Sequence, residues 1–190
     1  MPVRLYISFA GILSKNFCVL WIFEQCRPQL KDAPESVAEL VALCETSDIE
    51  SIIDPDAPCF AHPASMRAAI DTFCTETGQA VPQTAGDYCR VIFRSLALRY
   101  RQVVDILRSF APFPIDRLHV IGGGSQNRYL MQYTADALEM PVICGPVEGT
   151  ALGNVLVQLK TAGIVSTLSQ MRAISAASVE LKTYLPQNNK

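Results

Sequence analysis

Three consecutive glycines at residues 122–124 are the feature of this sequence that most directly indicates a ligand-binding site. A short apolar run at 118–121 predicts a buried strand before them, and a segment of helical period follows the polar residues 125–127. A glycine turn between a strand and a helix brings bare backbone N–H groups close to a phosphate, because no Cβ blocks the approach. The candidate nucleotide-binding residues are therefore Gly122, Gly123 and Gly124.

The glycine turn alone leaves two interpretations open, because such turns also occur in α/β proteins that bind nothing there. A dinucleotide-binding fingerprint would need glycine at position 127, where this sequence has asparagine. The pattern G-x-x-x-x-G-K-[ST] is absent from the sequence, which excludes a P-loop.

Carboxylates that could assist phosphoryl transfer follow the glycine turn. Asp136 falls about two and a half turns into the next helix, so a surface or packing role is favoured for it. Glu148 falls in a loop after a strand, a better position for a site residue, although a solvated loop acid is the simpler interpretation. Asp54 and Asp56 are interpreted as a turn. We predict no catalytic residue and no metal ligand in this sequence.

The composition argues against several function classes. A net charge of −2 without a basic run gives no case for a nucleic-acid partner. Seven cysteines without C-x-x-C spacing, beside two histidines, do not predict a zinc site, and the odd count fits a reducing, cytoplasmic location. The sequence leaves open a disulfide between Cys74 and Cys89. No apolar run is long enough to span a membrane, and residues 5–13 resemble a signal peptide only faintly.

The glycine turn must be positioned by elements that alternate between helix and strand in the second half of the chain. Strands are expected at 118–121 and 141–144 as a parallel pair, with further sheet strands upstream of residue 1. Thr84 with Asp87 is expected to cap the longest helix. The periodicity predicts helices over 15–25, 35–45, 63–78, 84–111, 130–138, 151–162 and 167–177.

A row of charged residues lies opposite the apolar stripe of the longest predicted helix. Such a row could bind an anion, but a solvated face is favoured because charged side chains are mostly exposed. The row consists of Arg90, Arg94, Arg101, Asp105 and Arg108.

Two motifs carry a resemblance to a known family. Residues 119–127 (HVIGGGSQN) and 145–154 (GPVEGTALGN) resemble the second lobe of the FGGY carbohydrate kinases. The resemblance covers residues 15–178. Within the family, the rhamnulokinases are the most similar group, on account of stretches at 15–27, 60–66 and 73–101.

The resemblance implies an α/β fold of the ribonuclease H-like, actin-like ATPase class, helix-rich with a small mainly parallel sheet. Residues 1–13 would form an irregular or truncated start, 14–180 the C-terminal kinase lobe, and 181–190 a loose tail.

The resemblance also implies a reaction. ATP with Mg²⁺ would bind with its phosphates toward the glycine turn, and its γ-phosphoryl group would pass to the 1-hydroxyl of L-rhamnulose. The ketose site and the catalytic base belong to the family's N-terminal lobe, so we expect this chain alone to be inactive. We expect no nucleic-acid or membrane partner. Self-association is expected through the apolar face that the missing lobe would leave uncovered.

The family's ATP-binding residues carry over by position. Gly123 and its neighbours match the ATP-binding turn, and Asn127 is included with them. Asn16 matches an ATP-contacting asparagine of rhamnulokinases. Glu24 falls where those enzymes have a glutamine, and this departure puts a negative charge near the nucleotide. Two alternatives remain open: another FGGY kinase, for fuculose or xylulose, or a non-catalytic module that keeps the fold.

Overall fold

The computed structural model describes residues 3–4, 7–8, 12–13, 16–17 and 19–187, with side chains from residue 20 onward. The helices are α1 (Val19–Cys26), α2 (Val37–Thr46), α3 (Met66–Glu76), α4 (Ala85–Phe110), α5 (Arg128–Leu138), α6 (Gly149–Thr161) and α7 (Leu168–Ala177). Short 3-10 turns are η1 (Arg27–Gln29), η2 (Pro58–Phe60) and η3 (Gly123–Gln126). The strands are β1 (Val3–Arg4), β2 (Ile7–Ser8), β3 (Ile12–Leu13), β4 (Asn16–Phe17), β5 (Leu118–Val120), β6 (Val142–Cys144) and β7 (Lys182–Tyr184).

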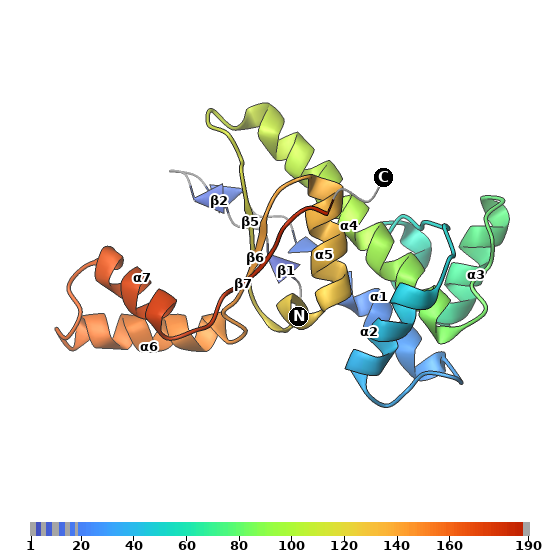
Figure 1. The fold of residues 1–190 in the computed structure, drawn as a ribbon, viewed down its shortest axis with the longest axis horizontal. Coiled ribbons are helices and arrows are strands. Elements are labelled where there is room, and N and C mark those ends of the chain that lie inside the picture. Colours follow the sequence, from blue (N-terminus) through green and yellow to red (C-terminus); the bar gives the residue numbers. More distant parts are fainter. Residues whose placement is uncertain (1–2, 5–6, 9–11, 14–15, 18, 188–190) are drawn as a thin grey trace.

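A three-stranded sheet in the order β5-β6-β7 lies beside α5, with α4 behind it (Figure 1). The parallel pairing expected for the first two strands is confirmed, with Leu118 opposite Val142 and Val120 opposite Cys144. The third strand runs antiparallel, so the sheet is mixed. Near the N-terminus, two short antiparallel pairs join β1 to β4 and β2 to β3.

Residues 182–187 contact the rest of the fold, although they lie in the segment 181–190 for which the sequence predicted a loose tail. Lys182–Tyr184 form β7, and Tyr184 is only 8% exposed. Two polar side chains of α5 hold the backbone beyond the strand: Gln132 Nε2 donates to the Leu185 carbonyl at 2.9 Å, and Asp136 Oδ1 accepts from the Gln187 N–H at 2.7 Å. These long-range contacts fix a segment that has no apolar periodicity of its own.

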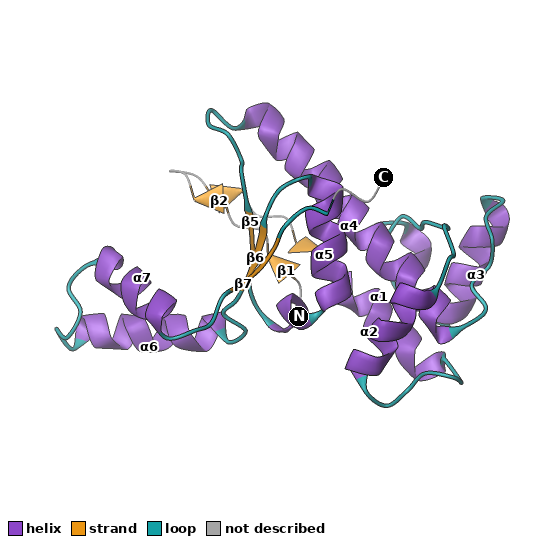
Figure 2. Cartoon of the chain, viewed as in Figure 1, coloured by secondary structure: helices purple, strands orange, loops and turns teal. Residues whose placement is uncertain are grey.

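The 26-residue helix α4 is the centre of the core, and α1, α2 and α5 all pack against it (Figure 2 shows how the helices gather around it). Most of its predicted apolar stripe is buried, with Phe93 fully enclosed and its ring centroid 4.9 Å from that of Phe23. The stripe is wrong at the end of the helix, where Ile106 and Phe110 are 55% and 75% exposed. The expected capping box is confirmed: Thr84 Oγ1 accepts from the Asp87 N–H at 3.2 Å, and the Asp87 carboxylate accepts from the Thr84 N–H at 3.0 Å.

The charged face of α4 is only partly solvated, which corrects the sequence-based expectation. Arg101 and Arg108 remain on the surface, with 48% and 38% of their side chains exposed. Arg90 and Arg94 are only 19% and 13% exposed. The loop of residues 47–53 runs along this face of α4, and its Ile49 carbonyl accepts a hydrogen bond from each of the two guanidinium groups.

Helices α6 and α7 project from the other side of the sheet, away from α4 and α5 (Figure 1). Among the described residues, α7 has no buried member, and large apolar side chains on both helices face solvent. The exposed ones include Val155, Val157, Leu168 and Ile174.

Candidate nucleotide site

The glycine turn lines a cleft of about 1040 Å³, a volume typical of small-molecule sites. One part of the lining comes from α1 and α2, and another from the turn itself and the first residues of α5 and α6. The predicted candidates Gly122, Gly123, Gly124, Asn127 and Glu24 all line this cleft.

Gly122 turns the chain from β5 into the 3-10 turn η3. Its φ of 89° and ψ of 179° lie in a region that only glycine occupies without strain. Its N–H donates to the Pro146 carbonyl at 3.1 Å, and its carbonyl accepts from the Ser125 N–H at 3.0 Å and the Ser125 hydroxyl at 2.7 Å. Gly122 is therefore needed by the fold.

Gly123 has a different character. Its φ lies outside the left-handed region, and a Cβ built on it would meet no atom within 4 Å. Neither backbone conformation nor internal packing therefore requires glycine at this position. Within the described residues, no acceptor pairs with the backbone N–H of Gly123 or Gly124. Two amide donors that find no acceptor among the described residues therefore lie on a bare backbone in the lining of the cleft.

Asn127 has a structural role that the sequence reasoning missed. Its side-chain oxygen accepts from the Leu130 N–H at 3.0 Å and so caps the N-terminus of α5. The signal was present in the sequence, because asparagine directly before an amphipathic helix is a favoured N-cap.

Two exposed carboxylates also line the cleft, one from α1 and one from the start of α6. They belong to Glu24 and Glu148. The cleft's lining also contains Arg128, whose Nη2 lies 3.0 Å from Oε2 of Glu45 in a surface ion pair. The lining therefore offers negative charge together with amide donors.

An apolar surface completes the cleft. Phe23 and Val41 are 3% and 4% exposed, and Val37, at 41%, is the most open of the three. Val37 therefore offers most of the surface against which an apolar group could lie, with Phe23 and Val41 buried in the same lining.

The other candidate residues lie apart from the cleft or outside the described side chains. Asn16 pairs through its backbone with Arg4, and its side chain lies outside the described part of the structure. Asp136 has the packing role favoured for it, because it accepts from Gln132 and Gln187. Asp54 and Asp56 form the predicted turn, with Oδ1 of Asp54 accepting from the Asp56 N–H at 3.0 Å.

Metal ligands, membrane-spanning helices and disulfides are the other features considered in the sequence. Over the part of the chain that is described, no group of three or more His, Cys, Asp or Glu could hold a metal ion, and no helix is long and apolar enough to cross a membrane. Cys74 and Cys89, for which the sequence left a disulfide open, are both free thiols.

Comparison with known proteins identifies the family. The model for the C-terminal domain of the FGGY family of carbohydrate kinases matches residues 6–162. A rhamnulokinase of Bacteroides thetaiotaomicron is 48% identical over 178 residues, covering 93% of this chain and 36% of that protein. The chain thus spans about a third of the length of the curated relatives it matches.

Solved structures share the fold at low identity. A gluconate kinase from Lactobacillus acidophilus matches with a TM-score of 0.62 at 15% identity, covering 93% of this chain and 35% of that one. A glycerol kinase from Plasmodium falciparum, crystallised with ADP, matches with a TM-score of 0.62 at 15% identity, covering 93% and 34%. The expected lobe fold is confirmed, and this chain belongs to the FGGY family of carbohydrate kinases, matching its C-terminal domain.

Proposed function

We propose that this chain is the nucleotide-binding lobe of an ATP-dependent sugar kinase, and that the sugar is L-rhamnulose. The observation that carries the proposal is the bare backbone at Gly123 and Gly124, whose N–H groups lack acceptors among the described residues. The membership of the chain in a carbohydrate kinase family supports the activity. The 48% identity to a rhamnulokinase supports the sugar.

The cleft fits a nucleoside polyphosphate. The amides of Gly123 and Gly124 would donate to phosphate oxygens, since the missing Cβ at Gly123 leaves the approach open. The apolar patch of Phe23, Val37 and Val41 would accept the base. Bound ATP supplies the γ-phosphoryl group, and Mg²⁺ neutralises charge on it. The chain's own contribution is to bind and orient the nucleotide.

The remaining parts of the reaction are assigned to other residues of a longer kinase. We assign no carboxylate of the cleft as the base that accepts the proton of the sugar hydroxyl. We propose that this base and the binding site for the ketose belong to the N-terminal lobe. We therefore expect this chain alone to bind nucleotide weakly and to transfer no phosphoryl group. Sugar phosphorylation with cellular ATP would place the protein in the cytoplasm.

A titration of ¹⁵N-labelled chain with ADP tests the nucleotide site. We expect the amide signals of Gly123 and Gly124 to shift, and Gly123→Ala to weaken ADP binding about tenfold. The same variant should unfold at or slightly above the wild-type temperature, because the added Cβ meets no atom within 4 Å and alanine restricts the unfolded chain. Wild-type affinity in Gly123→Ala, or shifts confined to another surface, would contradict the assignment.

A substrate panel tests the sugar. The full-length kinase that carries this domain should release ADP faster with L-rhamnulose than with L-fuculose or D-xylulose. A different preference would leave the kinase assignment intact and move the chain to another FGGY kinase. The acidic side chain of Glu24 in the cleft favours a second candidate, a non-catalytic module. That candidate would stand if the full-length protein failed to phosphorylate any of the three sugars.

A further inference from the structure

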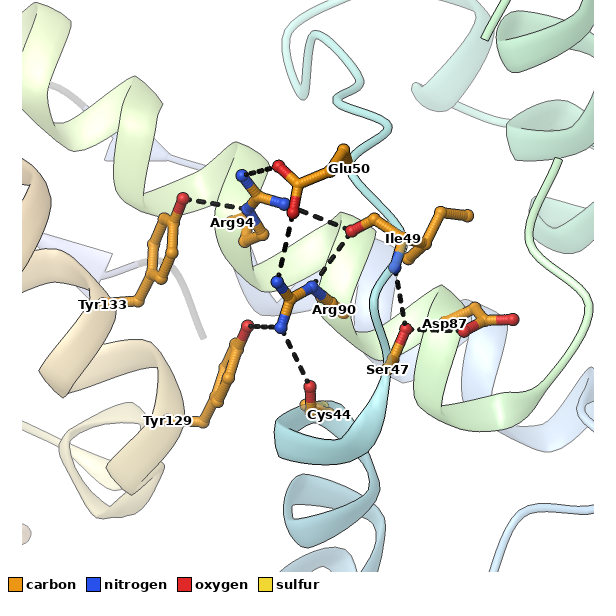
Figure 3. Close-up of polar contacts among 9 residues, drawn as sticks. All are labelled: Cys44, Ser47, Ile49, Glu50, Asp87, Arg90, Arg94, Tyr129 and Tyr133. Carbon is orange, nitrogen blue, oxygen red and sulfur yellow. Dashed lines mark hydrogen bonds and ion pairs between the residues drawn. The ribbon is translucent and has the colours of Figure 1, made fainter. Parts of the chain in front are cut away.

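Five polar side chains join α2, α4, α5 and the loop of residues 47–53 (Figure 3). They are Arg90, Arg94, Glu50, Tyr129 and Tyr133. We propose that Arg90 is a positioning residue, which ties the C-terminal end of α2 to the first turn of α5 and thereby fixes the glycine turn for the nucleotide. The part of this inference that concerns nucleotide affinity rests on the proposed function.

The Arg90 guanidinium donates in four directions. Its Nε donates to the Ile49 carbonyl at 3.0 Å, and its Nη1 donates to the Cys44 carbonyl at 3.4 Å. Nη1 also donates to the Tyr129 hydroxyl at 3.3 Å, and Nη2 lies 3.3 Å from Oε1 of Glu50 (Figure 3). One side chain of α4 therefore reaches a loop, a helix end and a helix start.

The two helix termini explain why this contact matters for the cleft. Cys44 is in the last turn of α2, where carbonyls lack partners within the helix and a cation is favoured. Tyr129 is the second residue of α5, two positions after the N-cap Asn127. Since α2 and the start of α5 both line the cleft, their separation sets its width.

The neutral acceptors contribute more than the ion pair does. Glu50 is 71% exposed, so its attraction to Arg90 is weakened by solvent. The Arg90 side chain is 19% exposed, so the carbonyl and hydroxyl contacts are shielded from water. Burial raises the pKa of the Tyr129 phenol to about 12, so this hydroxyl is neutral at physiological pH, as an ordinary tyrosine hydroxyl also is.

Arg94 offers a matched control one turn along the same helix. It donates to the same Ile49 carbonyl at 3.1 Å and pairs with the same Glu50 carboxylate at 2.6 Å. Its Nε donates to the hydroxyl of Tyr133 at 2.8 Å, one turn farther from the glycine turn. Among the described residues it makes no hydrogen bond to an α2 carbonyl, so its loss removes charge and loop contacts but leaves the tie between α2 and α5.

The experiment compares Arg90→Met with Arg94→Met in the full 190-residue chain. Amide hydrogen exchange reports the first turn of α5, where the Leu130 and Met131 N–H groups bond to Asn127. We expect Arg90→Met to speed their exchange and to weaken ADP binding, each about tenfold, and Arg94→Met to change both less than about twofold.

A second pair of variants keeps the charges and removes one oxygen each. Tyr129→Phe should reproduce the direction of both Arg90→Met effects, whereas Tyr133→Phe should leave both measurements unchanged. The inference would be overturned if Arg90→Met and Arg94→Met, or Tyr129→Phe and Tyr133→Phe, changed the exchange rates and the ADP affinity equally. It would also be overturned if Tyr129→Phe kept the wild-type exchange rates and affinity. If ADP shifted no signal of the wild-type chain, the proposed nucleotide site would fail, and the exchange rates alone would decide whether Arg90 fixes the turn.

Discussion

Replacing Gly122 with alanine isolates the conformational requirement of the turn after β5. A Cβ on Gly122 would meet no atom within 4 Å, so the substitution introduces no steric clash with other residues. The N–H that donates to Pro146 is retained. What changes is the backbone energy, because φ of 89° with ψ of 179° is a conformation that alanine adopts only under strain.

Two opposing contributions set the size of the effect. Holding a residue other than glycine in this region costs about 1–3 kcal/mol. Alanine also restricts the unfolded chain, which offsets about 0.4–1 kcal/mol of that strain. We therefore expect Gly122→Ala to lower the free energy of unfolding by about 1.3 kcal/mol, the difference between the middles of the two ranges, and by no more than about 2.6 kcal/mol.

Urea unfolding followed by far-UV circular dichroism measures this difference, and Gly123→Ala is the control. Gly123 has an ordinary φ and open space at its Cβ, so its substitution should leave stability unchanged or raise it by up to about 1 kcal/mol. Equal destabilisation of the two variants would refute the argument that one glycine serves the fold and the other keeps the backbone bare.

Two further changes test the core and the cap of α4. Phe93→Ala, at a fully buried position, should lower the free energy of unfolding by about 3–5 kcal/mol in the same assay. Burial raises the pKa of Asp87, but hydrogen bonds from Ser47 and from the Thr84 N–H outweigh it and hold that pKa below its ordinary value. The stabilisation is present above the unfolded pKa of about 3.9 and is lost as pH falls through the lower folded value. The urea midpoints of wild type and Asp87→Asn should therefore differ at neutral pH and converge in strong acid. If the difference between the two midpoints stayed the same at every pH, the ionised Asp87 carboxylate would not be the source of the stabilisation.

Elements with strong local signals were predictable from the sequence. The helix expected over 84–111 is observed as Ala85–Phe110, because its apolar stripe and its capping box both lie within the segment. The parallel pair of β5 and β6 followed from the alternation of strands and helices.

Elements held by distant residues were not predictable. The strand β7 depends on pairing with β6 and on two side chains of α5, none of which leaves a pattern in its three residues. Arg90 and Arg94 are on the polar side of the helical period, but a loop without periodicity folds over them. Helical period alone cannot show which part of a polar face another segment covers.

The candidate residues that the sequence named can be located but not assigned a role in nucleotide binding. The glycines, Asn127 and Glu24 lie in one cleft, and their contact with a nucleotide stays a prediction. The contacts of Arg90 were not predicted, since they depend on the end of α2 and the start of α5, which are far apart in sequence.

The electrostatic character of the cleft has a consequence for its response to ionic strength. Glu24 and Glu148 face the space that phosphates would enter, and the cation Arg128 is already engaged by Glu45. Dissolved salt shields repulsion between like charges. Metal-free ADP should therefore bind more tightly as sodium chloride is added, the reverse of the behaviour of sites built from lysine and arginine. Magnesium, by cancelling charge on the phosphates, should flatten that dependence.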